Sequence, residues 1–193
     1  MARYTPLPDF QRLITTHSSD GKAVFSSAID ETSKFKGVDN GNADFCLSYA
    51  TSSFPVDMNN DADLERYKEY LVSPPGLVDS QGTVLRHVDI KPGFTSPMHR
   101  TVSLDYGIVL MGEVELILDS GEKKIMKAGD IAIQAEGQII DDEQRGTNHA
   151  WRNTSDTEWA RMMYILQPAR PLEIEGKRLG EDLGDMEGVR KST

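Results

Sequence analysis

The chain of 193 residues has a single cysteine, no long hydrophobic run and fewer basic than acidic residues. Because Cys46 has no second cysteine to pair with, no intramolecular disulfide can form, and its thiol is expected to pack as a small buried hydrophobic group. No stretch reaches the roughly 18 apolar residues of a membrane-spanning helix, and residues 1–9 lack the apolar segment of a signal peptide. We therefore expect a cytoplasmic protein with no membrane partner.

The charge balance argues against a second class of partner. The chain has 31 acidic and 21 basic side chains, which gives a formal net charge of −10. A negative field of this kind repels the phosphates of nucleic acids and the anionic surface of a membrane. The sequence therefore predicts that the protein binds no nucleic acid.

The composition favours one globular domain that is rich in turns. Hydrophobic residues make up 38% of the chain, and its 16 glycines and 9 prolines are typical of a β protein. Residues 83–167 have the pattern of short strands separated by turn residues, which indicates a barrel or a sandwich. We expect residues 1–82 to add short strands and a short helix packed on this barrel. Residues 168–193 are expected to form a tail that wraps the barrel or a partner subunit.

Two segments give clear local predictions. Residues 112–130 alternate apolar and polar side chains around an Asp-Ser-Gly turn, which predicts a hairpin with one face in solvent. In residues 60–71, Leu64, Tyr67 and Leu71 recur at helical spacing behind asparagines and aspartates suited to an N-cap. This second segment therefore predicts a short helix.

Two motifs of spaced glycine, histidine and acidic residues lie in the strand-rich region. The first, GFTSPMHRTVSLDYGIVLMG, runs from residue 93 to 112 and contains His99 and Asp105. The second, GTNHAWRN, runs from residue 146 to 153 and contains His149. Both motifs resemble those of the small single-domain cupins. The resemblance implies an all-β fold, the jelly-roll-like double-stranded β-helix, with one or two short helices and N- and C-terminal extensions.

The same resemblance implies a pocket at His99, Asp105 and His149. In metal-binding cupins these motif positions hold three histidines and one glutamate, but here Thr101 replaces the second histidine and Asp105 replaces the glutamate. A hydroxyl is a poor ligand and aspartate is shorter than glutamate, so we expect no cofactor. The alternative is an open site in which His99, Asp105 and His149 hold one divalent first-row metal, Fe, Mn, Ni or Zn.

Strand alternation separates side chains that line the pocket from those that do not. Thr101, Trp151 and Met111 are the expected substrate contacts, and Trp151 has the parity of His149. Arg100 could bind a substrate carboxylate, but the alternation turns it away from the pocket, so a surface ion pair is the preferred interpretation.

Two further features have interpretations of their own. His87 has the parity opposite to the apolar residues of its strand, 83–90, which predicts an outward-facing side chain. Residues 135–144 look like an insertion, and they form either a flap at the barrel mouth or a lengthened surface turn.

The leading functional hypothesis is a redox-neutral enzyme that needs no cofactor. Similar cupins in bacteria and fungi include some that are encoded among genes of secondary metabolism, which implies a small organic, polyketide-like substrate in the barrel. We expect a lyase, isomerase or cyclase that catalyses dehydration, decarboxylation or ring closure. His99 and His149 would be the acid/base pair, and Asp105 would orient or neutralise one of them.

Two alternatives stay open. A metal-dependent cupin dioxygenase or decarboxylase would use His99, Asp105 and His149 as metal ligands. A non-catalytic small-molecule-binding protein would need the apolar barrel but no acid/base residue. In each case the long termini suit a homodimer joined by strand exchange or sheet extension.

Overall fold

A computed structural model describes residues 3–135, 148–170, 173–174, 177–178 and 181–192. Within these ranges the structure consists of strands, one α-helix, α1 (Ala62–Val72), and two short 3-10 turns, η1 (Asp39–Gly41) and η2 (Asn59–Asp61). The strands are β1 (Thr15–His17), β2 (Ala23–Phe25), β3 (Lys36–Val38), β4 (Ala43–Ala50), β5 (Val84–Ile90), β6 (Ser103–Met111), β7 (Glu113–Leu118), β8 (Lys123–Lys127), β9 (Ile131–Ala135), β10 (His149–Asn153), β11 (Ala160–Pro168), β12 (Glu173–Ile174) and β13 (Lys177–Arg178). The expected all-β fold with a short helix is confirmed. No helix in the described ranges combines the length and the apolarity needed to cross a bilayer.

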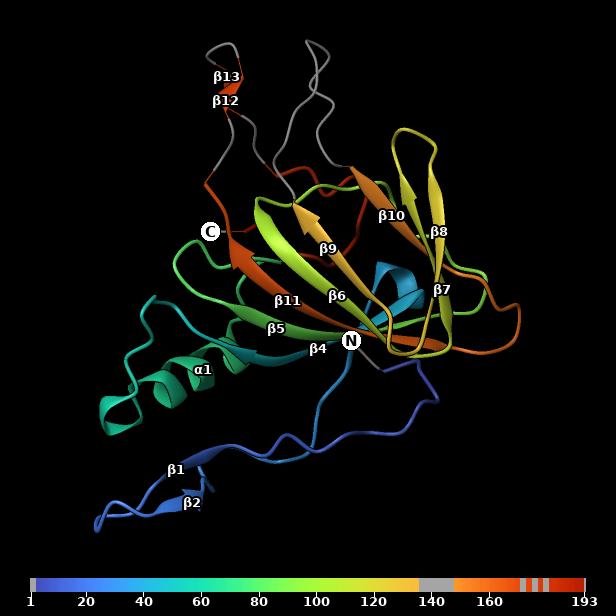
Figure 1. Cartoon of the computed structure of the whole chain (residues 1–193). Helices are drawn as coiled ribbons and strands as arrows, with labels where there is room; N and C mark the ends of the chain where they lie inside the picture. Colours follow the sequence, from blue (N-terminus) through green and yellow to red (C-terminus); the bar gives the residue numbers. More distant parts are fainter. Residues whose placement is uncertain (1–2, 136–147, 171–172, 175–176, 179–180, 193) are drawn as a thin grey trace.

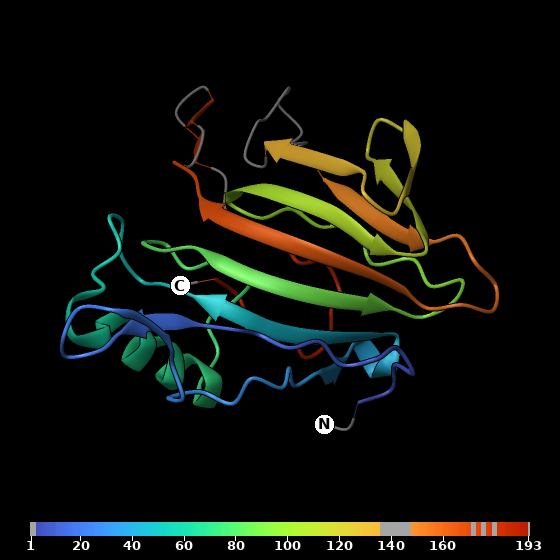
Figure 2. The ribbon, with the colours of Figure 1, turned by 60° about the horizontal axis from the view of Figure 1, so that its bottom comes forward.

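Two larger antiparallel sheets face each other (Figures 1 and 2). The first has six strands in the order β3-β4-β5-β11-β6-β9, and the second has three in the order β10-β7-β8. Single bridges from Thr95 to Arg152 and from His99 to His149 extend the smaller sheet by one irregular segment. Inward-facing side chains of both sheets form the core, among them Val88, Val109, Val114, Trp151 and Met162. This arrangement is the jelly-roll-like barrel that the two motifs predicted.

Glycines occupy both ends of the first motif because the backbone there turns to positive φ. Gly93 has a φ of 68° and Gly112 a φ of 79°, in the left-handed region that side chains with a Cβ disfavour. At Gly112 a Cβ would also lie 3.1 Å from that of Ala160. The two glycines of the motif thus mark the turns that lie before and after the segment containing β6.

The N-terminal third contributes directly to the larger sheet. Strand β4 pairs with β5 along its length and β3 pairs with β4, so the N-terminal strands extend the larger sheet. The chain before β3 crosses the face of the sheet that is turned away from β7 and β8 (Figure 2). Helix α1 packs near β4 through buried Leu64, Tyr67 and Tyr70, while Leu71, predicted to be on this face, is 44% exposed. Tyr70 takes that place because its hydroxyl donates to buried Asp79.

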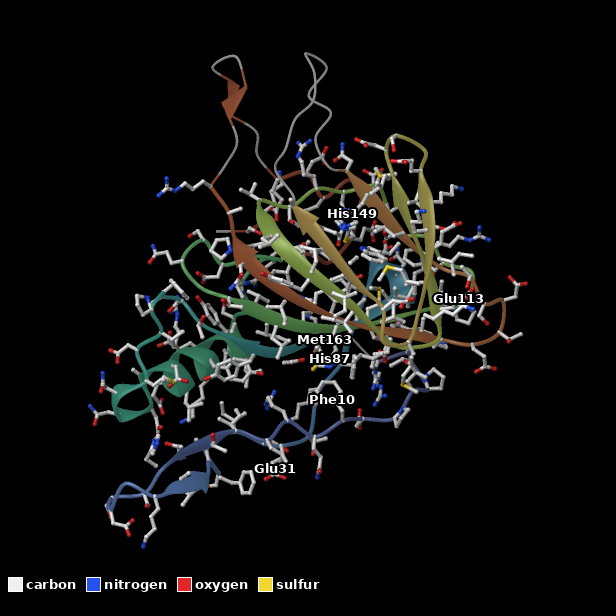
Figure 3. All side chains as sticks on the ribbon, in the orientation of Figure 1. Phe10, Glu31, His87, Glu113, His149 and Met163 are labelled. Atoms are coloured by element: carbon white, nitrogen blue, oxygen red, sulfur yellow. The ribbon has the colours of Figure 1, made fainter. Side chains whose placement is uncertain are left out.

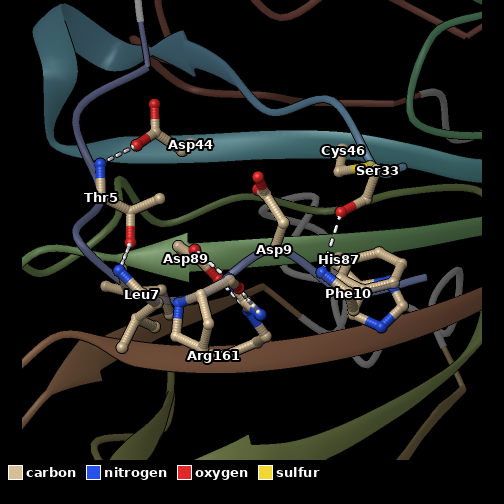
Figure 4. A network of polar contacts seen from close by, with 12 residues as sticks. Thr5, Leu7, Asp9, Phe10, Ser33, Asp44, Cys46, His87, Asp89 and Arg161 are labelled. Atoms are coloured by element: carbon tan, nitrogen blue, oxygen red, sulfur yellow. Dashed lines mark hydrogen bonds and ion pairs between the residues drawn. The ribbon is translucent and has the colours of Figure 1, made fainter.

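Polar contacts fasten the N-terminal segment to the sheet (Figure 4). Arg161 donates from Nε and Nη2 to the two carboxylate oxygens of Asp89, at 2.6 and 2.7 Å, and from Nη1 to the Pro8 carbonyl at 2.8 Å. Asp44 accepts hydrogen bonds from the backbone amides of Tyr4 and Thr5. Both acids are fully buried, so these contacts replace the water that the carboxylates lose.

The prediction that His87 faces outward is confirmed, and the outward face at this position is covered by protein. Its side chain points away from the barrel interior, but only 8% of the residue is exposed. Phe10 of the N-terminal segment covers it, with ring centroids 4.0 Å apart (Figure 3), and its Nδ1 lies 2.6 Å from the Ser48 hydroxyl. Burial lowers the pKa of His87 to about 4, and the positive charge of Arg161 acts in the same direction.

The C-terminal segment 181–192 packs on the chain's own barrel, as one of the two predicted arrangements. Leu183 is buried, and backbone hydrogen bonds in both directions link Asp182 to Arg100. This contact covers Arg100, which is 7% exposed, so its side chain is buried rather than on the surface, and the expected ion pair stays a prediction. The insertion predicted at 135–144 lies outside the described residues except for residue 135, which ends β9.

Candidate functional site

A cavity lies between the two sheets, with about 720 Å³ of atom-free space, part of which opens to solvent. Its walls are mainly apolar, as in most small-molecule sites. The apolar lining comes from Val38, Ala43, Phe45, Leu77, Val88, Ile90, Phe94, Tyr164, Leu166 and Met186, and the polar side chains that reach it include Arg86, His99, Thr101, Asp105, His149 and Trp151. The structure therefore brings His99, Asp105 and His149 into one space.

The two histidines face each other across paired backbone. His99 and His149 exchange both backbone hydrogen bonds at 2.9 Å, and their ring centroids are 4.2 Å apart with a tilt of 54°. The His99 Nδ1–H donates to the Pro97 carbonyl at 2.9 Å. Because a carbonyl only accepts, this contact assigns the proton to Nδ1 and leaves a lone pair on Nε2. Burial lowers the pKa of His99, against the Pro97 hydrogen bond and the charge of Asp182, so the ring is held neutral.

Asp105 lies on the inward face of β6, with 4% of the residue exposed. Its Oδ1 accepts from the Ser103 hydroxyl and its Oδ2 from the Thr101 hydroxyl at 3.3 Å. Burial raises the pKa of Asp105 to about 6, and the two hydrogen bonds limit the rise. Thr101, which replaces a metal-ligating histidine of the motif, thus supports a carboxylate in this chain.

The possible metal ligands of this cavity do not converge on one point within the described residues. Within them, no group of three His, Cys, Asp or Glu side chains gathers closely enough to hold one. Both carboxylate oxygens of Asp105 accept from hydroxyls, and Nδ1 of His99 is bonded to the Pro97 carbonyl. Asp105 also makes no hydrogen bond to either histidine in the described structure, so it does not orient one by direct contact. His99, Asp105 and His149 thus share a cavity without closing around one point in the described structure.

The three expected substrate contacts do not share one location. Thr101 and Trp151 line the cavity, but Met111 does not, and it is 37% exposed. The reason is an extra residue in β6: Arg161 pairs with Met111 and Met162 with Val109, so Leu110 is left over and the alternation shifts before Met111. A bulge of this kind cannot be inferred from alternation within one strand.

Two polar side chains in the cavity, those of Trp151 and Arg86, lie at positions other than those of the motifs' metal ligands. The Trp151 Nε1–H is buried without an acceptor in the described structure, and its ring meets those of His149 and Tyr164 edge-on at 6.0 and 5.8 Å. Arg86 also reaches the cavity and was not among the site residues predicted from the sequence. Strand alternation does indicate its position, because Arg86 shares the inward parity of Val84 and Val88 on β5.

Several known proteins are similar to this chain in sequence or in fold. The profile of the Cupin domain family matches residues 86–166. The Phomopsin biosynthesis cluster protein D of Diaporthe leptostromiformis is 47% identical over 169 residues, covering 88% of this chain and 84% of that protein. The cupin-domain-containing oxidoreductase virC of Hypocrea virens is 40% identical over 174 residues, covering 88% and 82%. Among solved structures, the polyketide cyclase RemF of Streptomyces resistomycificus is 13% identical, with a TM-score of 0.45 over 81% of this chain and 83% of that one.

Proposed function

The chain belongs to the cupin family, and from that premise we propose that it is an acid–base enzyme of secondary metabolism that needs no cofactor. The proposed reaction is that of a lyase, isomerase or cyclase on a small organic molecule in the cavity. Support for the metabolic setting comes from relatives named for phomopsin and oryzines biosynthesis clusters, at 47% and 43% identity. The chemistry rests on one observation, a carboxyl with a raised pKa and two histidines in a mainly apolar cavity.

In the proposed mechanism, His99 and Asp105 have complementary roles. The neutral ring of His99 offers the Nε2 lone pair as a base that removes a proton from the bound molecule. Asp105, with its pKa raised to about 6, has both protonation states accessible near neutral pH and can return a proton at a second atom. The apolar walls exclude water, which protects a charged intermediate from competing reactions. The ring of His149 lies beside that of His99, with centroids 4.2 Å apart, and is the second histidine of the proposed acid–base pair.

The test works before the substrate has been identified. Purified protein is incubated in D₂O with an extract of the producing organism from which this gene has been deleted, and products are compared by mass spectrometry. We expect a product that has lost water or carbon dioxide, or has kept its formula, and that carries deuterium from the solvent. Asp105→Asn and His99→Gln should abolish its formation, whereas His17→Asn, on exposed β1, should not. A product that gains oxygen would contradict the proposal.

A metal-dependent oxidoreductase is the second candidate, favoured by the name of the relative from Hypocrea virens. It is separated from the first by elemental analysis of the purified protein, with a His99→Ala variant as the control for adventitious metal. A stoichiometric first-row metal that disappears in the variant would establish the oxidoreductase candidate. Metal below stoichiometry, together with turnover, would support the acid–base enzyme.

A further inference from the structure

Arg86 is a buried guanidinium that has no acidic partner among the described residues. Only 8% of the residue is exposed, and its side chain points into the cavity from β5. Nη2 donates to the Gly76 carbonyl at 2.9 Å, and the guanidinium carbon lies 5.3 Å from the centroid of the Phe45 ring. Nε is buried and has no acceptor in the part of the chain that the structure describes. A cation held in this way has lost its hydration without gaining a counter-charge.

Arg161, in the same sheet, is a buried guanidinium with a structural role, and it is paired with a carboxylate. Its Nε and Nη2 contact both oxygens of Asp89, on the face of the sheet opposite to the cavity. Arg86 receives no such carboxylate from the described ranges. Burial lowers the pKa of Arg86 to about 10, so the side chain stays charged at neutral pH. The cavity thus holds a positive charge that no described side chain pairs.

Arg86 also lines a surface groove between the N-terminal segment, α1 and the C-terminal segment. Among the described residues of this groove, five other side chains are basic, Arg12, Lys34, Lys36, Lys68 and Arg190, and one is acidic, Asp30. Two of them are paired with acids, Lys34 with Asp30 and Lys68 with Glu65. The others still leave an excess of positive charge in the groove, on a chain whose net charge is −10. Such a groove attracts anions and raises their local concentration. Arg86 is placed where the groove and the cavity share a wall.

We propose that Arg86 binds a carboxylate of the substrate, so that the enzyme acts on a small organic acid. A guanidinium presents donors in a planar fork that matches the two oxygens of a carboxylate, and the unused Nε donor supplies part of that fork. Trp151 Nε1 offers a further donor in the same cavity. The statement that the bound acid is a substrate rests on the proposed function. The binding of a carboxylate rests on Arg86 alone.

The experiment compares benzoate with benzyl alcohol, two probes of similar size that differ in charge, by calorimetric titration. The wild-type chain should bind benzoate at least about tenfold more tightly than benzyl alcohol, as expected of a charge-assisted hydrogen bond in a buried site. Arg86→Met should remove this preference and leave binding of the alcohol unchanged, and Arg86→Lys should retain part of it. Arg66→Met removes a positive charge from the exposed face of α1 and should have no effect.

Thermal denaturation checks that the variants are folded. Arg86→Met should melt at the wild-type temperature or above, because it removes an unpaired buried charge. Equal binding of the two probes by the wild-type chain, or no binding of benzoate, would overturn the inference whatever the variants do. Asp105→Asn should keep the benzoate preference, so loss of turnover in that variant tests the proposed function without affecting this inference. Benzoate preference in a chain that proves to contain stoichiometric metal would overturn only the proposed function.

Discussion

At the scale of single residues, Asp105 shows how burial and hydrogen bonding oppose each other. Removal from water favours the neutral acid, while the hydroxyls of Thr101 and Ser103 favour the carboxylate. Burial prevails, and the pKa rises from 3.8 to about 6. The folded state therefore binds more protons than the unfolded state between these two values, and stability must fall as the pH rises through that window.

This difference in pKa predicts the effect of Asp105→Asn on stability. The variant cannot ionise, so its free energy of unfolding relative to wild type should rise by up to roughly 3 kcal/mol between pH 4 and pH 7. Urea denaturation at a series of pH values measures the difference directly. A constant difference across the series would show that the carboxyl ionises as easily in the folded chain as in the unfolded one.

At the scale of elements, β5 separates two environments. Arg86, on one face, meets the cavity, while His87, on the other, is covered by Phe10 from the N-terminal segment. Strand alternation predicts this division from sequence, as it predicts the inward positions of Asp105 and Trp151. It does not predict what covers each face, because that depends on contacts between segments far apart in the chain. Terminal segments bury both His87 and Arg100. At Met111 the alternation itself is broken, because β6 has one extra residue, Leu110, opposite β11.

The burial of His87 should make the free energy of unfolding depend on pH in the acid range. The pKa of His87 falls from 6.5 in the unfolded chain to about 4 in the folded one. Between these values the unfolded state binds more protons, so stability is lost as the pH falls from about 6.5 to about 4. His87→Asn keeps a polar partner for Ser48 but cannot titrate. It should reduce the acid loss of unfolding free energy by up to roughly 3 kcal/mol, and His17→Asn on exposed β1 should reduce it far less. Urea denaturation between pH 4 and pH 7 measures both effects, and equal effects of the two substitutions would contradict the assigned burial.

At the scale of the whole molecule, the C-terminal segment connects the outer surface to the cavity. Met186 lines the cavity, and the Ser192 hydroxyl accepts a hydrogen bond from the Val78 amide at 2.9 Å. The backbone of this segment passes so close to Gly76 that a Cβ there would lie 2.3 Å from the Lys191 carbonyl oxygen. The Gly76 carbonyl in turn accepts the only hydrogen bond that the Arg86 side chain makes to the described protein. The tail therefore supports the loop that fixes the guanidinium.

Gly76→Ala tests this connection without touching a side chain of the cavity. The new methyl group must displace the backbone at Lys191, which we expect to cost about 1–3 kcal/mol of unfolding free energy and to weaken benzoate binding severalfold. In a chain that lacks residues 181–193, which is itself less stable because Leu183 is no longer buried, the same substitution should cost little, since the clashing backbone is gone. The double-mutant cycle, measured by urea denaturation and calorimetry, isolates the coupling between tail and loop. Equal costs in both chains would mean that the loop at Gly76 holds Arg86 without help from the tail.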